Sequence, residues 1–271
     1  MSENKDCVNE NDPAEQEQKP DINKYKGHFA LAGKDRGCSG AFLGSVCLVG
    51  FLINDRSCTW TDEDIKQIKK VLSKAADYLK TESKLSDRRL SISYAFDSVP
   101  IQHKFDRYGY LRSVTAVLQQ YGFDDAASYQ EHYEQKFKKS EAPIIFFINR
   151  NFRSFAVDSK SQDPSPHASE FCFVSFEPDD IKGCVRSLIH EVLHQFGAID
   201  YYYPDRVKKV ALKKFPESVM LHGLKVDDLT RYLIGWDSVP SEAALSFLEE
   251  TADVTAEEIA EAYEKDRDRD W

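Results

Sequence analysis

One short stretch decides how this sequence builds a site: residues 190–200 read HEVLHQFGAID. On a helix, His190 and His194 lie on one face, separated by about 6 Å of rise along the axis. Two imidazole nitrogens in that arrangement can each reach one cation at about 2.0–2.1 Å. Glu191 points roughly 100° away from His190, which makes it a poor ligand for that ion but places it to accept a proton from a nearby water. The pattern predicts a zinc site with Glu191 as the general base.

A catalytic zinc needs a third protein ligand and one open position. Gly197 follows the predicted helix, and glycine tolerates the positive φ that a sharp turn requires. Asp200 comes three residues later and can turn back toward the ion. The sequence therefore predicts one zinc ion per chain, held by His190, His194 and Asp200.

The flanking residues support a buried helix from about Pro178 to Phe196. Proline is favoured at a first helical position, and Asp179 and Asp180 suit the positive end of the helix dipole. Apolar side chains recur along this stretch at Ile181, Val185, Leu188, Ile189, Val192, Leu193 and Phe196. A helix packed on so much apolar surface would hold its ligands rigidly.

The extended pattern HExxHxxGxxD resembles the zinc signature of metzincin-like peptidases. It is most similar to the branch in which an aspartate replaces the usual third histidine, as in snapalysin-like and immune-inhibitor-A-like enzymes. A second mark of that family is a tight turn containing methionine beneath the metal. Ser218-Val219-Met220 matches it, and Met220 is one of only two methionines in the chain, the other being Met1.

The resemblance implies hydrolysis of a peptide bond by a metal-activated water, with Glu191 as the general base and a protein or peptide as substrate. Some relatives carry a tyrosine two residues after the methionine, where this chain has His222. His222 is therefore a candidate contact for the oxyanion or substrate, or else a polar loop residue. Tyr202, in the run Tyr201-Tyr202-Tyr203-Pro204, either contacts substrate or packs as part of an aromatic loop.

The resemblance also implies an α+β fold of the zincin or metzincin type, with a twisted mixed sheet, an active-site helix and a mostly helical C-terminal subdomain. We predict strands at residues 45–53, 90–96, 143–149, 152–157 and 171–176, the last as the antiparallel edge that binds extended peptide, although an interior strand is equally consistent with its pattern. We predict helices from Thr61, over 112–138, 178–196, 226–236 and 241–263, and a short one in between. Residues 158–169 form a loop.

The domain division follows composition. Residues 1–25 are polar and acidic and are predicted to be a disordered tail, because they cannot bury enough apolar surface to offset ordering entropy. Residues 26–271 form the catalytic domain, with an N-terminal subdomain to about 197 and a C-terminal subdomain over 198–271. A tail cysteine, Cys7, could bind the zinc and inhibit it, but nothing flanking it favours that.

The formal net charge of −10 argues against nucleic acid and against an anionic membrane surface as partners. The first residues lack the apolar region of a signal peptide, and the six cysteines form no CxxC pair, so we expect a cytoplasmic protein with free thiols. Export by another route stays open. Two alternatives to a peptidase remain: a zinc hydrolase of a non-protein substrate, and a non-catalytic zinc-binding interaction protein.

Overall fold

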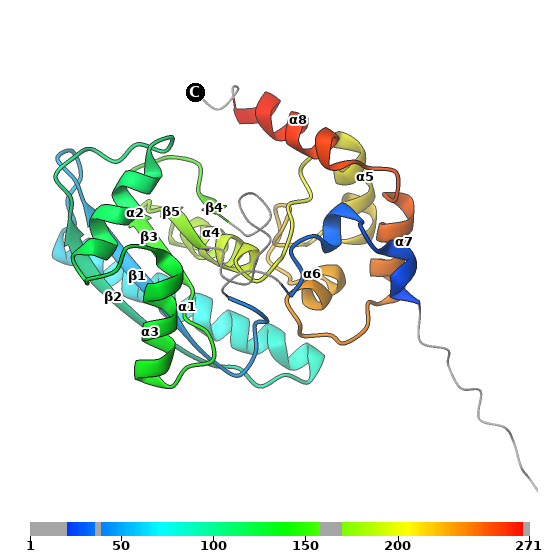
Figure 1. The fold of residues 1–271 in the computed structure, drawn as a ribbon, viewed down its shortest axis with the longest axis horizontal. Helices are drawn as coiled ribbons and strands as arrows, with labels where there is room; N and C mark the ends of the chain where they lie inside the picture. Colours follow the sequence, from blue (N-terminus) through cyan, green and yellow to red (C-terminus); the bar gives the residue numbers. More distant parts are fainter. Residues whose placement is uncertain (1–20, 36–38, 158–169, 268–271) are drawn as a thin grey trace, which may run out of the picture.

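The computed structural model describes residues 21–35, 39–157 and 170–267. It has a mixed α+β architecture with one five-stranded sheet and eight α-helices within those ranges. The helices are α1 (Asp62–Ser83), α2 (Tyr110–Gln119), α3 (Ala126–Phe137), α4 (Ile181–His194), α5 (Asp205–Lys214), α6 (Asp228–Leu233), α7 (Glu242–Glu250) and α8 (Ala256–Arg267). In Figure 1 the sheet and α1–α4 form one lobe, the sheet lobe, while α5–α8 form a second, the C-terminal lobe.

The sheet has the strand order β2-β1-β3-β5-β4. Its strands are β1 (Ser45–Asn54), β2 (Ser91–Pro100), β3 (Ile144–Ile148), β4 (Phe155–Val157) and β5 (Phe171–Ser175). β2, β1, β3 and β5 run parallel, and β4 pairs antiparallel with β5. The expected mixed sheet is therefore present, but the predicted edge is wrong. β5 is interior, because it pairs with β3 on one side and with β4 on the other, and the shorter β4 occupies the edge.

Both faces of the sheet are covered, because successive residues of a strand point to opposite sides. From β1, Val46 and Leu48 pack into the core that α1 and α4 complete, whereas Cys47 and Val49 pack into the core formed with α2 and α3. The near-continuous apolar runs of β1, β3 and β5 follow from this double burial.

Helix α1 begins where the sequence predicts. Thr61 and Asp64 form a reciprocal capping box, and Asp62, Glu63 and Asp64 stand in the first turn. Two other ranges predicted as helical are each divided in the structure. Residues 112–138 form two helices, α2 and α3, separated by a turn in which Gly122 has φ +83°. Residues 241–263 likewise form α7 and α8, because Thr255 starts a new helix by accepting a hydrogen bond from the backbone of Glu258.

The first described residues pack on the C-terminal lobe. The short 3₁₀ helix η1 (Ile22–Tyr25) lies within the range predicted as tail, yet Tyr25 is buried and its hydroxyl lies 3.4 Å from the carbonyl of Leu245. After η2 (Phe29–Leu31), the chain crosses to the sheet lobe. His28 contacts Thr251 at 3.1 Å. Residues 1–20, including Cys7, and the predicted loop 158–169 lie outside the described residues.

Four cysteines fall in the described ranges, and all four are buried free thiols: Cys47, Cys58, Cys172 and Cys184. In the same ranges, no helix combines the length and apolar character needed to cross a bilayer.

Candidate metal centre

Helix α4 carries the two histidines in the middle of the molecule. It packs against α1 and β5, and its residues from Leu188 to His194 are all buried. The helix begins at Ile181 rather than at Pro178, because the side chain of Asp180 caps it by accepting a hydrogen bond from the backbone of Gly183 at 2.8 Å. Apolar packing along most of its length fixes where the histidine side chains project.

A second contact ties the end of this helix to the sheet. The buried side chain of Gln195 accepts a hydrogen bond from the backbone N–H of Ile144 and donates one to its carbonyl, both at 3.2 Å. This amide therefore satisfies both backbone groups of the first residue of β3. Sequence analysis missed Gln195, although its position beside His194 in the motif was visible.

Each histidine is oriented by a backbone carbonyl. His190 Nδ1 lies 2.9 Å from the carbonyl oxygen of Val219, and His194 Nδ1 lies 3.0 Å from that of Ala198. A carbonyl can only accept, so each Nδ1 carries the proton and donates it. The Nε2 atom of each neutral ring is then an acceptor, and the two Nε2 atoms face each other at 3.2 Å.

Asp200 brings a third acceptor to the same point. Its Oδ1 lies 3.0 Å from His190 Nε2 and 3.3 Å from His194 Nε2, and this oxygen is buried without a hydrogen-bond donor among the described residues. Three acceptor atoms at such short separations repel one another unless a cation or a proton lies between them. When no cation is bound, a proton on Nε2 of either histidine would supply that positive charge; charge and hydrogen bonds of this kind outweigh the burial of Asp200 and hold the pKa of its carboxyl well below the ordinary value.

The distances among the two histidine Nε2 atoms and Oδ1 of Asp200 suit zinc. An ion bound at about 2.0–2.1 Å to donors arranged tetrahedrally would place those donors about 3.3 Å apart. The three observed distances of 3.0, 3.2 and 3.3 Å are close to that value. Two imidazoles and one carboxylate are also a donor set that zinc accepts. The residues present therefore fit the ion that the sequence predicts.

Glu191 competes with Asp200 for the role of third ligand. One of its carboxylate oxygens lies within 4.8 Å of the histidine ring nitrogens, so the three side chains form a possible metal-binding group. The oxygen of Asp200 is nearer to both rings, at 3.0 and 3.3 Å. Of the two carboxylates, that of Asp200 is therefore the better placed to complete a site with the histidines, and Glu191 lies beside it.

The carboxyl of Glu191 has a pKa close to neutral pH. Burial raises the pKa of its carboxyl to about 7, and the negative charge of Asp200 acts in the same direction. Positive charge on His190, Arg153 and Arg107 opposes the rise. A carboxylate with such a pKa can take a proton and give it back near neutral pH, which general acid–base catalysis requires.

The turn from Ser218 to Gly223 lies directly against His190. The carbonyl of Val219 orients that histidine, and the carbonyl of Met220 accepts a hydrogen bond from the backbone of Tyr201 at 3.2 Å. Met220 itself is fully buried in the core. Gly223 is required here, because a Cβ at this position would lie 1.9 Å from the carbonyl oxygen of Glu217.

A buried aspartate organises this turn. Asp227 accepts hydrogen bonds from the hydroxyls of Ser218 at 2.6 Å, Thr230 at 2.7 Å and Tyr201 at 2.9 Å. Ser218 in turn accepts from the backbone N–H of Met220 at 3.0 Å. We call Asp227, Ser218, Thr230 and Tyr201 the Asp227 network. It joins α6, the methionine turn and the loop that carries Asp200.

The two candidate substrate contacts are differently placed. The ring of Tyr202 stacks on that of His190 with centroids 5.8 Å apart, and its hydroxyl donates to the carbonyl of Leu221 at 2.5 Å. His222 is exposed, and its ring lies 5.3 Å from that of Tyr202. Burial lowers the pKa of His222, as do the positive charges of Lys208 and Arg186. Tyr202 thus packs on the site, while His222 stands at its rim.

The loop carrying Asp200 contains two features that matter for placement. Gly197 has φ +93°, and a Cβ there would lie 2.7 Å from the carbonyl oxygen of Gly33, so only glycine fits. The second feature was not visible in the sequence. Tyr263, on α8, donates a hydrogen bond to Oδ2 of Asp200. No local motif signals this contact, because 63 residues separate the two partners along the chain.

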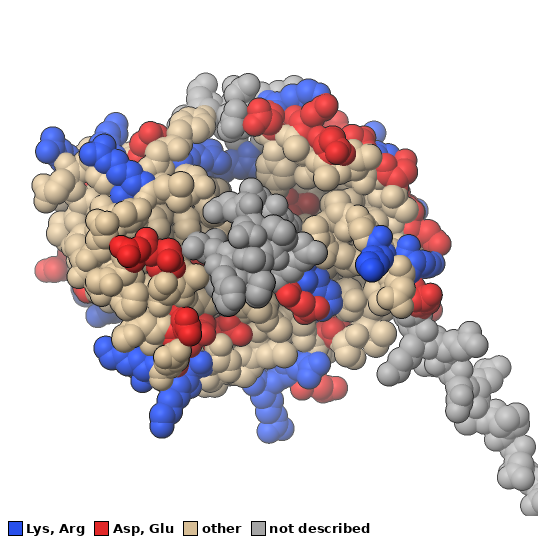
Figure 2. All heavy atoms as spheres, viewed as in Figure 1, with Lys and Arg blue, Asp and Glu red and all other residues tan. Residues whose placement is uncertain are grey.

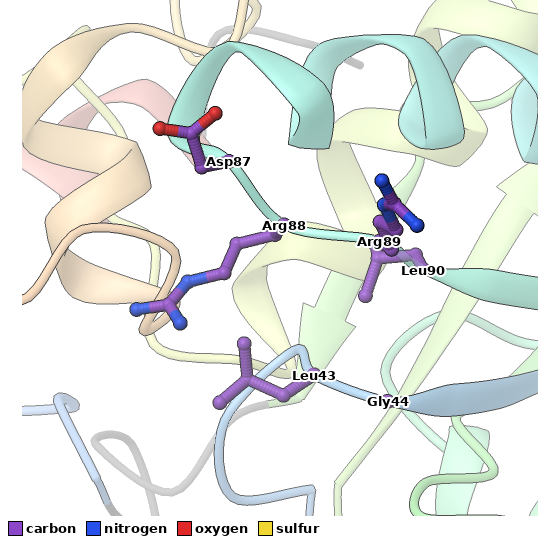
Figure 3. Close-up of a pocket in the computed structure, with 6 residues that line it drawn as sticks. All are labelled: Leu43, Gly44, Asp87, Arg88, Arg89 and Leu90. Carbon is purple, nitrogen blue, oxygen red and sulfur yellow. The ribbon is translucent and has the colours of Figure 1, made fainter.

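The surface between the two lobes is hollowed at its upper edge in Figure 2, with Lys and Arg side chains on the sheet-lobe side and Asp and Glu side chains on the opposite rim. A separate depression lies before β1 and β2, lined by Leu43, Gly44 and residues 87–90 (Figure 3). It contains none of the predicted site residues, and Arg88 there donates through Nε to the carbonyl of Trp236 at 2.7 Å. This depression does not compete as the catalytic site.

Comparison with known proteins adds little. No family model matches the sequence, and no curated protein matches it. Among solved structures, the fold is similar to that of metalloproteinase-II from Bacteroides fragilis, with a TM-score of 0.36 and 11% sequence identity. The match covers 84% of this chain and 60% of that chain, so this chain spans less than two thirds of that protein's length. A likeness at this TM-score is too weak to decide fold or function.

Proposed function

We propose that this protein is a zinc-dependent peptidase of the metzincin-like kind, with His190, His194 and Asp200 as ligands. One observation carries the proposal: three acceptor atoms from separate side chains converge at 3.0–3.3 Å, with both histidine tautomers fixed by backbone carbonyls. The Asp200 ligand, the methionine turn against His190 and the mixed sheet support the aspartate branch of that family.

Zinc bound there would lower the pKa of a bound water and polarise the carbonyl of a substrate. The chain's own residues would do the rest. His190 and His194, held by Val219 and Ala198, would keep both Nε2 lone pairs on the ion. Glu191, with its pKa near 7, would accept the proton of the attacking water and deliver it to the leaving amine. Two neutral histidines and one carboxylate leave a zinc site near +1, which makes Glu191 more important.

The edge strand of the sheet supports a peptide as the substrate. β4 is short and antiparallel, and it stands at the edge of the sheet next to the strand that precedes α4. An edge strand offers unpaired backbone groups to an extended chain, which is one way that proteins recognise peptides. A zinc hydrolase of a non-protein substrate and a non-catalytic zinc-binding interaction protein remain the alternatives, and the substrate test below separates a peptidase from both.

The test compares Glu191→Gln with Glu177→Gln. Glu177 is exposed and precedes α4, so its variant controls for loss of a carboxylate close to the helix. Both variants and the parent are measured for zinc content and for cleavage of a broad peptide library. We expect Glu191→Gln to keep zinc and lose turnover by about 10²–10⁴-fold, because it lacks the proton acceptor. Glu177→Gln should behave as the parent.

Cleavage by Glu191→Gln at the rate of the parent would show that the mechanism is wrong. Cleavage of no peptide by a zinc-loaded parent would remove the peptidase assignment and leave the hydrolase of another substrate and the non-catalytic zinc-binding protein. Loss of zinc from Glu191→Gln would make Glu191 a ligand instead of a base.

A further inference from the structure

The carboxylate of Asp200 has two oxygens in two different environments. Oδ1 faces both histidine Nε2 atoms and has no hydrogen-bond donor among the described residues, whereas Oδ2 accepts a hydrogen bond from the hydroxyl of Tyr263. A carboxylate held in this way by one oxygen presents the other in a fixed direction. Unlike the histidines, Asp200 stands on a loop rather than a helix, so it depends more on such a contact.

Tyr263 comes from α8, the last described helix, which lies beside α5 on the C-terminal lobe in Figure 1. α8 is anchored independently of the metal centre. Thr255 and Glu258 cap its start reciprocally, and Arg206 of α5 forms ion pairs with Asp253 at 2.7 Å and with Glu258. Because the helix has its own anchors, it can act as the support and Asp200 as the group supported.

An aromatic contact adds to the support. The ring of Tyr263 packs edge-on against Tyr203 with centroids 5.3 Å apart, and the hydroxyl of Tyr203 accepts a hydrogen bond from the guanidinium of Arg153 at 3.4 Å. Arg153 lies two residues before the start of β4 on the sheet lobe. The Tyr263 hydroxyl is thus held over Asp200 by contacts with the loop that bears the ligand and, through Tyr203, with the other lobe.

We infer that Tyr263 is a positioning residue for the metal ligand Asp200, so that α8 completes the metal centre from the far end of the chain. The inference rests on the proposed function only in taking Asp200 as a ligand. Hydrogen bonds to metal ligands fix their orientation, and losing one commonly costs roughly 10–100-fold in metal affinity. Coupling between two sites is reciprocal, so zinc binding should in turn reduce local opening of α8.

The test measures zinc affinity by competition with a chelator, without any substrate, in Tyr263→Phe and in Tyr94→Phe. The two tyrosines are similarly exposed, at 40% and 38%, but Tyr94 stands on β2, at the opposite edge of the sheet. We expect Tyr263→Phe to weaken zinc binding roughly 10–100-fold and to change the visible spectrum of the cobalt-substituted protein, because the carboxylate is reoriented. Tyr94→Phe should match the parent in both. Equal affinities and spectra for Tyr263→Phe and the parent would overturn the inference.

A second measurement uses the unaltered protein and does not depend on a variant folding. Hydrogen exchange of the amides in α8 should slow when zinc is added to the metal-free protein. Exchange in α8 that is indifferent to zinc, while α4 responds, would also overturn the inference. These outcomes are separate from the peptidase test: zinc lost with His190→Ala but not with Tyr263→Phe would leave the proposed site intact.

Discussion

The sheet lobe and the C-terminal lobe hold their parts of the metal centre in different ways. The sheet lobe supplies the two histidines of the proposed site from one helix, α4, which is buried along most of its length against α1 and β5. The C-terminal lobe supplies Asp200 from a loop, held by the Asp227 network on one side and by Tyr263 on the other. Apolar packing fixes the first part, and side-chain hydrogen bonds fix the second.

The difference matters because the two kinds of support fail differently. Burial of apolar surface is non-directional and spread over many residues, so a single change leaves most of it in place. A buried polar network depends on each member, because an unpaired partner costs the full desolvation of its group. We therefore expect α4 to be robust to conservative changes and the Asp200 side to be sensitive to the loss of single hydrogen bonds.

The largest effect should come from the ligands themselves. Replacing His190 and His194 together by alanine removes two of three donors and should abolish zinc binding. Asp200→Asn keeps the shape but loses the anionic donor, and it should weaken zinc binding by more than the roughly 10–100-fold typical of outer contacts. Zinc content and affinity are measured after dialysis. Asp205→Asn, five residues on at the exposed start of α5, is the control and should bind zinc as the parent does.

Full zinc retention by the double histidine variant would break the comparison, because the sheet lobe would then supply no ligand. Equal affinity in Asp200→Asn and Asp205→Asn would remove the C-terminal lobe from the metal centre.

The next effect concerns stability. Asp227→Asn leaves three hydroxyls around a neutral amide that accepts through only one oxygen. We expect the free energy of unfolding to fall by about 3 kcal/mol, because buried hydrogen bonds to a charged group are lost. Denaturant unfolding checks this, with Asp179→Asn, an exposed position before α4, as the control. A change below that of the control would mean that the network contributes little to the C-terminal lobe.

The smallest effect on stability should come from a buried polar cluster of the sheet lobe, in which Asp55 follows the end of β1. Burial opposes ionisation of Asp55, but hydrogen bonds from the backbone of Phe105, from Ser57 and from Arg150 outweigh it and keep its pKa below the ordinary value. A carboxyl with a lowered folded-state pKa stabilises the protein above its unfolded pKa, near 3.9, and loses this contribution as pH falls through the folded pKa.

Asp55→Asn should therefore cost about 1–2 kcal/mol at pH 7 and progressively less below about pH 4. Unfolding free energies of parent and variant from pH 7 to pH 2 measure the gap between them. A gap that stays constant over this range would show that ionisation of Asp55 does not contribute to stability.

Much of the fold and of the site could be predicted from the sequence, for reasons that follow the same contrast. Local apolar patterns mark the strands β1, β3 and β5 and the helix α4, so the residue ranges of these elements were predicted closely. The convergence of His190, His194 and Asp200 follows from helical spacing and from a glycine that permits a tight turn. Residues whose role depends on partners distant in sequence could not be found this way. Gln195, Asp227 and Tyr263 contact groups from other elements, and no local pattern specifies those contacts.

The same limit explains the wrong edge strand. β4 and β5 are both short and apolar, so periodicity could not say which of them pairs on two sides. The order in the sheet places β5 between β3 and β4, because the strand that leads directly into α4 pairs parallel with β3. Topology, rather than the composition of either strand, decides which one is left at the edge.

The packing of the first described residues on the last helices has a consequence for how the chain is made. Tyr25 and His28 find their partners at Leu245 and Thr251, more than 200 residues later. During synthesis, these contacts can form only after α7 has been made, by which point β1 to β5 and α4 are already complete. Contacts this distant in sequence slow folding, because loop closure must precede them. A chain synthesised only as far as α4 therefore carries both histidines but lacks Asp200 and Tyr263, which follow later in the sequence.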